Sequence, residues 1–189
     1  MKEVLEEAAK PAETYSSVEP KEFNLPFAYE LIETYFNGLQ NYILIKVKES
    51  GVVVYVVAQV SYNEVKNVFV LPNEYLSSSQ TSTSLILRKH LILVSEQGEM
   101  CFLNYNLRVL QSKVTFSSKP PKSIVHNYQN SIYVIVCERK VYIVDDITFN
   151  LKREIAGSFD QAAVNVDTKV LLLNESNNMV IYDTEDKNF

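Results

Sequence analysis

Side chains suited to acid–base chemistry or metal binding are few in this sequence and stand far apart. His90 and His126 are the only histidines, and neither has a second histidine, a cysteine or a carboxylate at a metal-ligand spacing such as HxxxH or CxxC. The chain has four glycines, and they form neither GxGxxG nor a phosphate-binding P-loop. The sequence therefore predicts no catalytic residue, no cofactor and no metal. His126 is interpreted as a hydrogen-bonding core or rim residue.

The cysteines and the N-terminal stretch bear on the cellular compartment. Cys101 and Cys137 lie far apart, each inside an apolar run, which favours buried reduced thiols over a disulfide. The N-terminal stretch is acidic and has no apolar centre, so it does not resemble a secretory signal. The apolar runs reach at most about ten residues, too short for a membrane-spanning helix. We expect a cytoplasmic or nuclear protein without membrane insertion.

The charge balance bears on the class of partner. The formal net charge is −5, and no cluster of lysine and arginine stands out along the chain. Nucleic-acid affinity rests largely on Lys and Arg side chains that neutralise phosphates. The sequence therefore argues against a nucleic-acid partner.

A polar residue closes each of three similar segments. The segments are KHLILVSEQGEMCFLN (89–104), NSIYVIVCERKVYIVD (130–145) and TKVLLLNESNNMVIYD (168–183). Each has an apolar run, a polar turn, a second apolar run and a closing Asn or Asp. The distance from the first apolar residue to the closing residue is 13 positions in all three, namely Leu91 to Asn104, Ile132 to Asp145 and Val170 to Asp183. The segments recur after 41 and 38 residues, which indicates an internal repeat.

Shorter strand-like runs complete the repeat unit. TSLIL, KSIVHN and QAAVNV precede the three segments, and the more polar RVLQSKVTF and NLKREI follow the first two. The unit is thus a short strand, a central strand, a third strand and a polar outer strand. A weaker copy lies upstream, where YILIKVKESGVVVYVVAQV predicts two strands around the turn at 49–51 and EVKNVFVL a third. Residues 27–36 suit either a helix or a strand.

A period near forty residues with four strands per unit is typical of a β-propeller blade. KVYIVDDITFNLKREIAG and NMVIYDTEDKNF also resemble the end of a WD40 repeat, where a strand ends in a Trp-Asp pair before a turn. The chain has no tryptophan, and the Trp position holds Leu103, Val144 and Tyr182. The Gly-His pair that opens such repeats is missing too. The resemblance covers roughly residues 85–186 and implies an all-β, WD40-like propeller of three to four blades, in partial or open form.

These patterns divide the chain into a tail and one domain. Residues 1–22 carry six acids, three lysines and two prolines with little to bury, and we expect a flexible acidic tail there. Residues 23–189 are expected to form the propeller-like domain, with blades at about 27–76, 81–118, 122–157 and 161–189. Only TEDKNF follows the third strand of the last unit, so we expect that strand, 179–183, to be an edge. A strand from the N-terminal region of the chain, a second copy of the chain or another subunit could cover this edge. We favour other protein subunits or further blades that complete the propeller, because an N-terminal strand could close the ring only if four blades suffice.

Most of the remaining polar residues have a structural interpretation. Asn104, Asp145 and Asp183 precede predicted turns, where each side chain would accept hydrogen bonds from the turn backbone. Tyr105 and Tyr128, in predicted turns, are the candidate surface contacts. The run SSSQTSTS (77–84) is interpreted as a mobile inter-blade loop that could accept phosphate groups.

The repeat, the lack of a catalytic signature and the acidic tail predict a non-catalytic protein–protein interaction module, a subunit or scaffold of a larger complex. The alternative is an enzyme, a hydrolase or lyase, with a pocket on the propeller axis. That alternative requires converging carboxylates, or His126, at the mouth of such a pocket.

Overall fold

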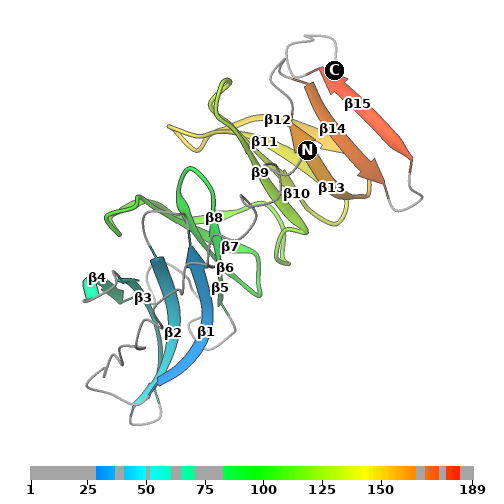
Figure 1. Cartoon of the computed structure of the whole chain (residues 1–189). Helices are drawn as coiled ribbons and strands as arrows, with labels where there is room; N and C mark the ends of the chain where they lie inside the picture. Colours follow the sequence, from blue (N-terminus) through cyan, green and yellow to red (C-terminus); the bar gives the residue numbers. More distant parts are fainter. Residues whose placement is uncertain are drawn as a thin grey trace, which may run out of the picture.

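The computed structural model describes residues 29–36, 41–49, 52–60, 65–70, 83–164, 169–174 and 178–183, and every regular element in them is a β-strand. The strands form four antiparallel sheets that follow one another along the chain (Figure 1). In these ranges no helix is long and apolar enough to cross a membrane. The predicted tail, 1–22, and most of the predicted Ser/Thr-rich loop lie outside the described residues.

Each sheet is a meander in which strands adjacent in sequence pair with each other. Sheet 1 contains β1 (Tyr29–Phe36), β2 (Asn41–Glu49), β3 (Val52–Val60) and β4 (Val65–Val70). Sheet 2 contains β5 (Thr83–Leu87), β6 (Leu91–Ser95), β7 (Glu99–Leu103) and β8 (Val109–Thr115). Sheet 3 contains β9 (Ser123–Asn127), β10 (Ile132–Val136), β11 (Lys140–Asp145) and β12 (Leu151–Ala156). Sheet 4 contains β13 (Phe159–Val164), β14 (Lys169–Asn174) and β15 (Met179–Asp183).

The all-β class expected from the sequence is confirmed, and one ambiguous segment is resolved. Within the stretch 27–36, which suited either a helix or a strand, Tyr29–Phe36 forms β1. β1 pairs along its length with β2, with Tyr29 opposite Val47 and Phe36 opposite Asn41. A neighbouring strand therefore decides the conformation of this segment, as it often does where local propensity is balanced.

Burial falls from the inner to the outer strands. Every residue of β6 and β10 is buried, and β7 and β11 are buried through their centres. In β12, by contrast, only Ile155 is buried. Strands covered on both faces need continuous apolar runs, whereas an outer strand that meets water alternates. This gradient explains why LILVS and IYVIV are continuously apolar while LKREIA is not.

The sheets stack face to face, and alternate residues of one strand face different neighbours. Leu91 and Leu93 of β6 pack with Tyr42 and Leu44 of sheet 1. The residues between them face the other way: Ile92 and Val94 pack in the core shared with sheet 3, which includes Tyr133 and Ile135. The same alternation in β10 turns Val134 and Val136 toward sheet 4, where Val170 and Leu172 meet them. Because successive side chains of a strand point to opposite faces, one apolar run serves two cores.

One glycine is required by its turn. Gly98, between β6 and β7, has a φ of 76°, in the left-handed region, and its N–H donates to the Ser95 carbonyl at 2.9 Å. A Cβ atom at this position would overlap the backbone carbonyl oxygens of Ser117 and Lys119. The turn therefore packs directly against the connection between β8 and β9, and only glycine fits there without moving backbone.

Candidate functional site

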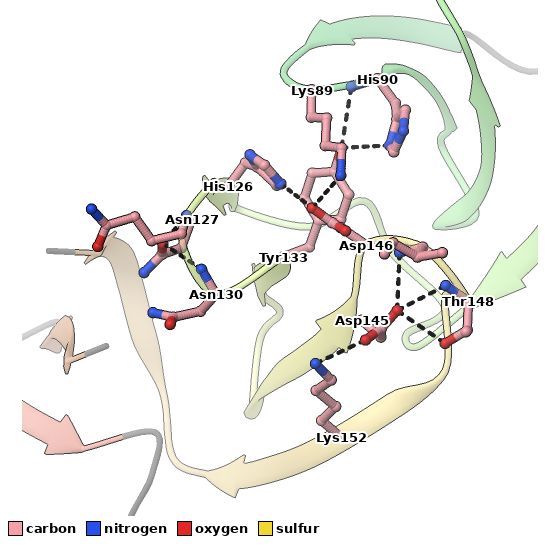
Figure 2. A network of polar contacts seen from close by, with 12 residues as sticks. Lys89, His90, His126, Asn127, Asn130, Tyr133, Asp145, Asp146, Thr148 and Lys152 are labelled. Carbon is pink, nitrogen blue, oxygen red and sulfur yellow. Dashed lines mark hydrogen bonds and ion pairs between the residues drawn. The ribbon is translucent and has the colours of Figure 1, made fainter. Parts of the chain in front are cut away.

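The most extensive buried polar arrangement described lies between sheets 2 and 3, and Figure 2 shows it from close by. Its centre is Asp146, in the turn that follows β11. One carboxylate oxygen, Oδ2, accepts from Lys89 Nζ at 2.9 Å and lies 2.6 Å from His126 Nε2. Lys89 belongs to the turn between β5 and β6, so this carboxylate links the two sheets. We call Lys89, His90, His126, Tyr133 and Asp146 the inter-sheet cluster.

A second link runs through Tyr133, on β10. Its hydroxyl lies 2.9 Å from His90 Nδ1 and accepts from the His90 backbone N–H at 3.2 Å. The His126 ring packs against the Tyr133 ring, with centroids 4.8 Å apart, and meets Tyr128 edge-on at 4.2 Å. Arg88 adds another connection, because its Nε donates to the Ile124 carbonyl at 2.8 Å. The side chains of Arg88 and Lys89 reach from sheet 2 to sheet 3, and the side chain of Tyr133 reaches from sheet 3 to His90. Residues 88–90 are thus held to sheet 3 by side chains from both sheets.

The cluster keeps one negative charge out of water. Burial raises the pKa of Asp146, but the hydrogen bonds and positive charges of Lys89 and His126 outweigh it and leave the pKa below its usual value. Burial and the charge of Lys89 lower the pKa of His90. Burial raises the pKa of Tyr133, so its hydroxyl stays protonated. The space between sheets 2 and 3 therefore holds an ionised aspartate, a lysine and two histidines, and it is partly shielded from solvent.

A carboxylate beside a histidine is also the geometry of a general base, but this pair is inaccessible. The side chains of His126 and Asp146 are 1% and 0% exposed. A general base must come within hydrogen-bond reach of the proton that it removes. Three buried polar atoms here, His126 Nδ1, Asn130 Nδ2 and Asp146 Oδ1, have no hydrogen-bond partner among the described residues. The arrangement is suited to holding two sheets together, at some desolvation cost.

The pKa shifts of the cluster predict acid sensitivity. A group whose folded-state pKa is lowered stabilises the fold above its unfolded-state pKa, and that stability is lost as the pH falls through the folded value. For His90 the loss begins below the ordinary histidine value of 6.5, and for Asp146 below 3.8. We expect the urea midpoint to fall from pH 7 to pH 5, and His90→Gln to flatten that fall. Urea titrations at each pH test this, and an unchanged slope in the variant would contradict it.

Sequence patterns identified only part of this cluster. His126 was expected to be a hydrogen-bonding core or rim residue, and its hydrogen bond to Asp146 is of that kind. No sequence pattern indicated that Asp146, Lys89 or Tyr133 would belong to a polar site. The double aspartate at 145–146 could have indicated Asp146, because neither of the other two segments has an acidic residue directly after its closing position.

The predicted turn residues lie at the ends of the third strands, and two of them border a described turn. Asn104 directly follows β7, and its Oδ1 accepts from the backbone N–H groups of Asn106 at 2.9 Å and Arg108 at 3.0 Å. Asp145 ends β11, and its Oδ1 accepts from the N–H groups of Ile147 at 3.0 Å and Thr148 at 2.8 Å. Asp183 ends β15, opposite Lys169, and the residues after it lie outside the described part of the chain.

Charge distinguishes the two described turns. Lys152 Nζ lies 2.8 Å from Asp145 Oδ2, and this hydrogen bond, with those from Thr148 and Ile147, holds the pKa of Asp145 well below its usual range.

We expect Asn104→Ala to cost about 1 kcal/mol, the typical value for hydrogen bonds of a partly exposed turn. Asp145→Ala should lower the melting temperature further than Asp145→Asn, which keeps Oδ1 as an acceptor. Thermal unfolding of the three variants tests this order. Equal decreases in melting temperature for the two Asp145 variants would contradict it.

The two candidate surface tyrosines differ in exposure. Tyr128, in the turn between β9 and β10, is 69% exposed. Tyr105 is half-buried, donates its hydroxyl to the Arg88 carbonyl and accepts at its backbone carbonyl from the Tyr42 hydroxyl at 2.8 Å. Tyr128 is therefore the more available of the two for a partner. In the described ranges no group of three His, Cys, Asp or Glu side chains could hold a metal ion.

Comparisons with known proteins identify the fold. No protein-family model and no curated protein sequence matches the chain. Among solved structures, it is similar to the C-terminal WD40 domain of Sif2, with a TM-score of 0.56, 15% identity, and coverage of 87% of this chain and 50% of that one. The β-propeller domain of Cps50 (Swd1) from Myceliophteria thermophila gives a TM-score of 0.51, 13% identity, and coverage of 78% and 55%. The chain thus has a WD40-like β-propeller fold in open, partial form, and it spans about half the length of these structures.

Proposed function

We propose that this chain is a non-catalytic protein–protein interaction module, a subunit or scaffold of a larger complex, and that it binds through the free face of sheet 4. The observation that carries the proposal is the exposure of two apolar side chains on β15. Met179 and Ile181 are 66% and 65% exposed. Large exposed apolar side chains on one sheet face are typical of an interaction surface.

The repeat supports a specific occupant for this face. Val141 and Ile143 hold the equivalent positions on β11 of sheet 3, and they are 0% and 3% exposed because sheet 4 covers them. The alternate residues of β15, Val180 and Tyr182, pack against sheet 3. Met179 and Ile181 therefore belong to the opposite face, the one that the next blade covers in sheets 2 and 3. A blade-like apolar sheet from another polypeptide fits this surface.

The strand at this end of the structure supports the same conclusion. Among the described residues, β15 is the terminal strand of sheet 4 and pairs with β14 (Figure 1). Tyr29–Phe36 and Asn41–Glu49, which could have closed the edge from the N-terminal side, form β1 and β2 of sheet 1. An apolar terminal strand invites pairing with another chain. Full burial of Met179 and Ile181 would contribute about 1.5–3 kcal/mol each.

We also propose a cytoplasmic or nuclear location. Cys101, on β7, and Cys137, directly after β10, are buried free thiols with 0% and 4% exposure. Unpaired cysteines suit a reducing compartment.

Affinity purification from the native source tests the function. The tagged chain should retain a protein partner in a stoichiometric amount, and Met179→Glu combined with Ile181→Glu should lose it, because two charges would enter an apolar interface. The matched control is Leu110→Glu with Leu151→Glu, two exposed leucines on β8 and β12. Absence of a stoichiometric partner, or equal loss in the control, would refute the proposal.

A further inference from the structure

A second polar region lies at the other end of the strands from the inter-sheet cluster. A cavity of about 340 Å³, open to solvent, is formed where the β8–β9 connection meets the turn between β10 and β11. Ser117 and Ser118 line it from the connection, and Arg139 and Lys140 line it from the turn. These side chains supply hydroxyl, guanidinium and ammonium donors to one space.

The frame of this cavity is built before any ligand arrives. The Phe116 ring stacks on the Tyr142 ring, with centroids 4.8 Å apart, and the Tyr142 hydroxyl donates to the Phe116 carbonyl at 2.9 Å. Cys137 N–H donates to the Lys140 carbonyl at 2.9 Å, which closes the turn. The Arg139 carbonyl accepts from Gly157 N–H at 2.9 Å, which fixes the turn from outside. A fixed frame lowers the entropy cost of binding.

Among the described residues around the cavity, the positively charged side chains outnumber the carboxylates by one. Three lysines near its rim have carboxylate partners: Lys119 with Glu138 at 2.6 Å, Lys122 with Asp160 at 2.9 Å, and Lys140 with Glu154 at 2.5 Å. Arg139 forms no ion pair among the described residues, although its charge helps to lower the pKa of Glu138, which also lines the cavity. Burial and the charge of Glu138 raise the pKa of the Cys137 thiol to about 11, so the cysteine adds no negative charge at neutral pH. The lining therefore carries a guanidinium that no ion pair holds, beside a Glu138 carboxylate that is already paired with Lys119.

We propose that this cavity binds a phosphorylated serine or threonine side chain of a partner peptide. A guanidinium donates two parallel hydrogen bonds to a phosphate, and the hydroxyls of Ser117 and Ser118 can reach a third oxygen that a carboxylate lacks. Ser117 Oγ already accepts from Lys119 N–H at 3.3 Å, so its own proton is available to a ligand. The site is separate from the free face of sheet 4 and does not depend on that surface.

Titration of the ¹⁵N-labelled protein with the blocked tripeptide Ac-Ala-pSer-Ala-NHMe tests the proposal. The amide signals of residues 117–119 and 138–140 should shift, while those of 104–108, at the other end of β8, should not. Arg139→Gln should weaken binding by about tenfold or more, the effect of losing a charge-assisted bidentate contact. Arg108→Gln is the matched control, because it removes the same charge at the far end of the sheet.

A second variant separates binding from a structural role. Glu138→Gln removes the carboxylate that occupies Lys119, so it should tighten binding by about threefold, within the range of exposed ion pairs. The Ac-Ala-Ser-Ala-NHMe and Ac-Ala-Glu-Ala-NHMe peptides should shift the same signals far less than the phosphopeptide. Equal binding of the three peptides, equal shifts with inorganic phosphate alone, or unchanged affinity in Arg139→Gln would overturn the proposal.

Discussion

We expect Asp146→Ala to lower the free energy of unfolding by about 3 kcal/mol. Removing one partner of a buried ion pair typically costs about 3–5 kcal/mol, because the remaining charge stays in a low-dielectric environment. The lower end applies here, since the Lys89 side chain is 34% exposed and can turn toward water. The variant also leaves His126 Nε2 without its acceptor. Urea denaturation at pH 7 measures this loss.

Two companion variants show whether the carboxylate itself is responsible. Asp146→Asn keeps the shape of the side chain and one acceptor oxygen, so it should lower the free energy of unfolding less than Asp146→Ala does. Lys89→Ala should cost about 1–3 kcal/mol, because the Asp146 carboxylate that it leaves behind is 0% exposed and keeps His126 as its partner. If Asp146→Ala and Lys89→Ala have equal, small effects, the cluster does not hold sheets 2 and 3 together.

The second large effect is expected at Gly98. Gly98→Ala should cost about 2–5 kcal/mol, because it combines the left-handed φ penalty of about 1–2 kcal/mol with overpacking of about 1–3 kcal/mol. The overpacking arises where the new methyl group meets the backbone oxygens of Ser117 and Lys119. Those oxygens belong to the main chain and cannot rotate away as a flexible side chain would. Chemical denaturation measures the loss.

A neighbouring position provides the control for Gly98. Gln97 lies in the same turn and is exposed, so Gln97→Ala should change stability by less than about 0.5 kcal/mol. Crystals of the Gly98→Ala variant should show the connection at 117–119 displaced. A stability equal to that of the unchanged protein would mean that the turn and the connection are not in close contact.

The fold class could be predicted because its signals are local. Period-two patterning, continuous apolar runs and the turn residues between them all act within about ten positions, and they repeat along the chain. The strands of sheets 2 and 3 follow these signals closely. Segment 27–36 could not be assigned in this way, because its aromatic residues suit a helix as well as a strand, and pairing with β2 decides the matter.

The candidate site was less accessible to sequence reasoning. Lys89 is 57 positions from Asp146, and His126 is 20 positions from it. No local spacing relates such residues, since only the stacking of two sheets brings them together. Tyr105 and Tyr128 looked alike as turn residues, yet Tyr105 is half-buried and hydrogen-bonded while Tyr128 is open to solvent.

By itself, the sequence determined that this chain forms repeated antiparallel sheets with apolar inner strands and polar outer strands. The tertiary structure decided the register: Ile132 pairs with Asp145, whereas Leu91 pairs with Leu103 and leaves Asn104 just beyond its strand. It also decided that Val141 and Ile143 are buried while Met179 and Ile181 are exposed. The physical reason is the same in each case. An apolar residue on a strand specifies that some surface must cover it, and only the packing of whole sheets specifies which surface does.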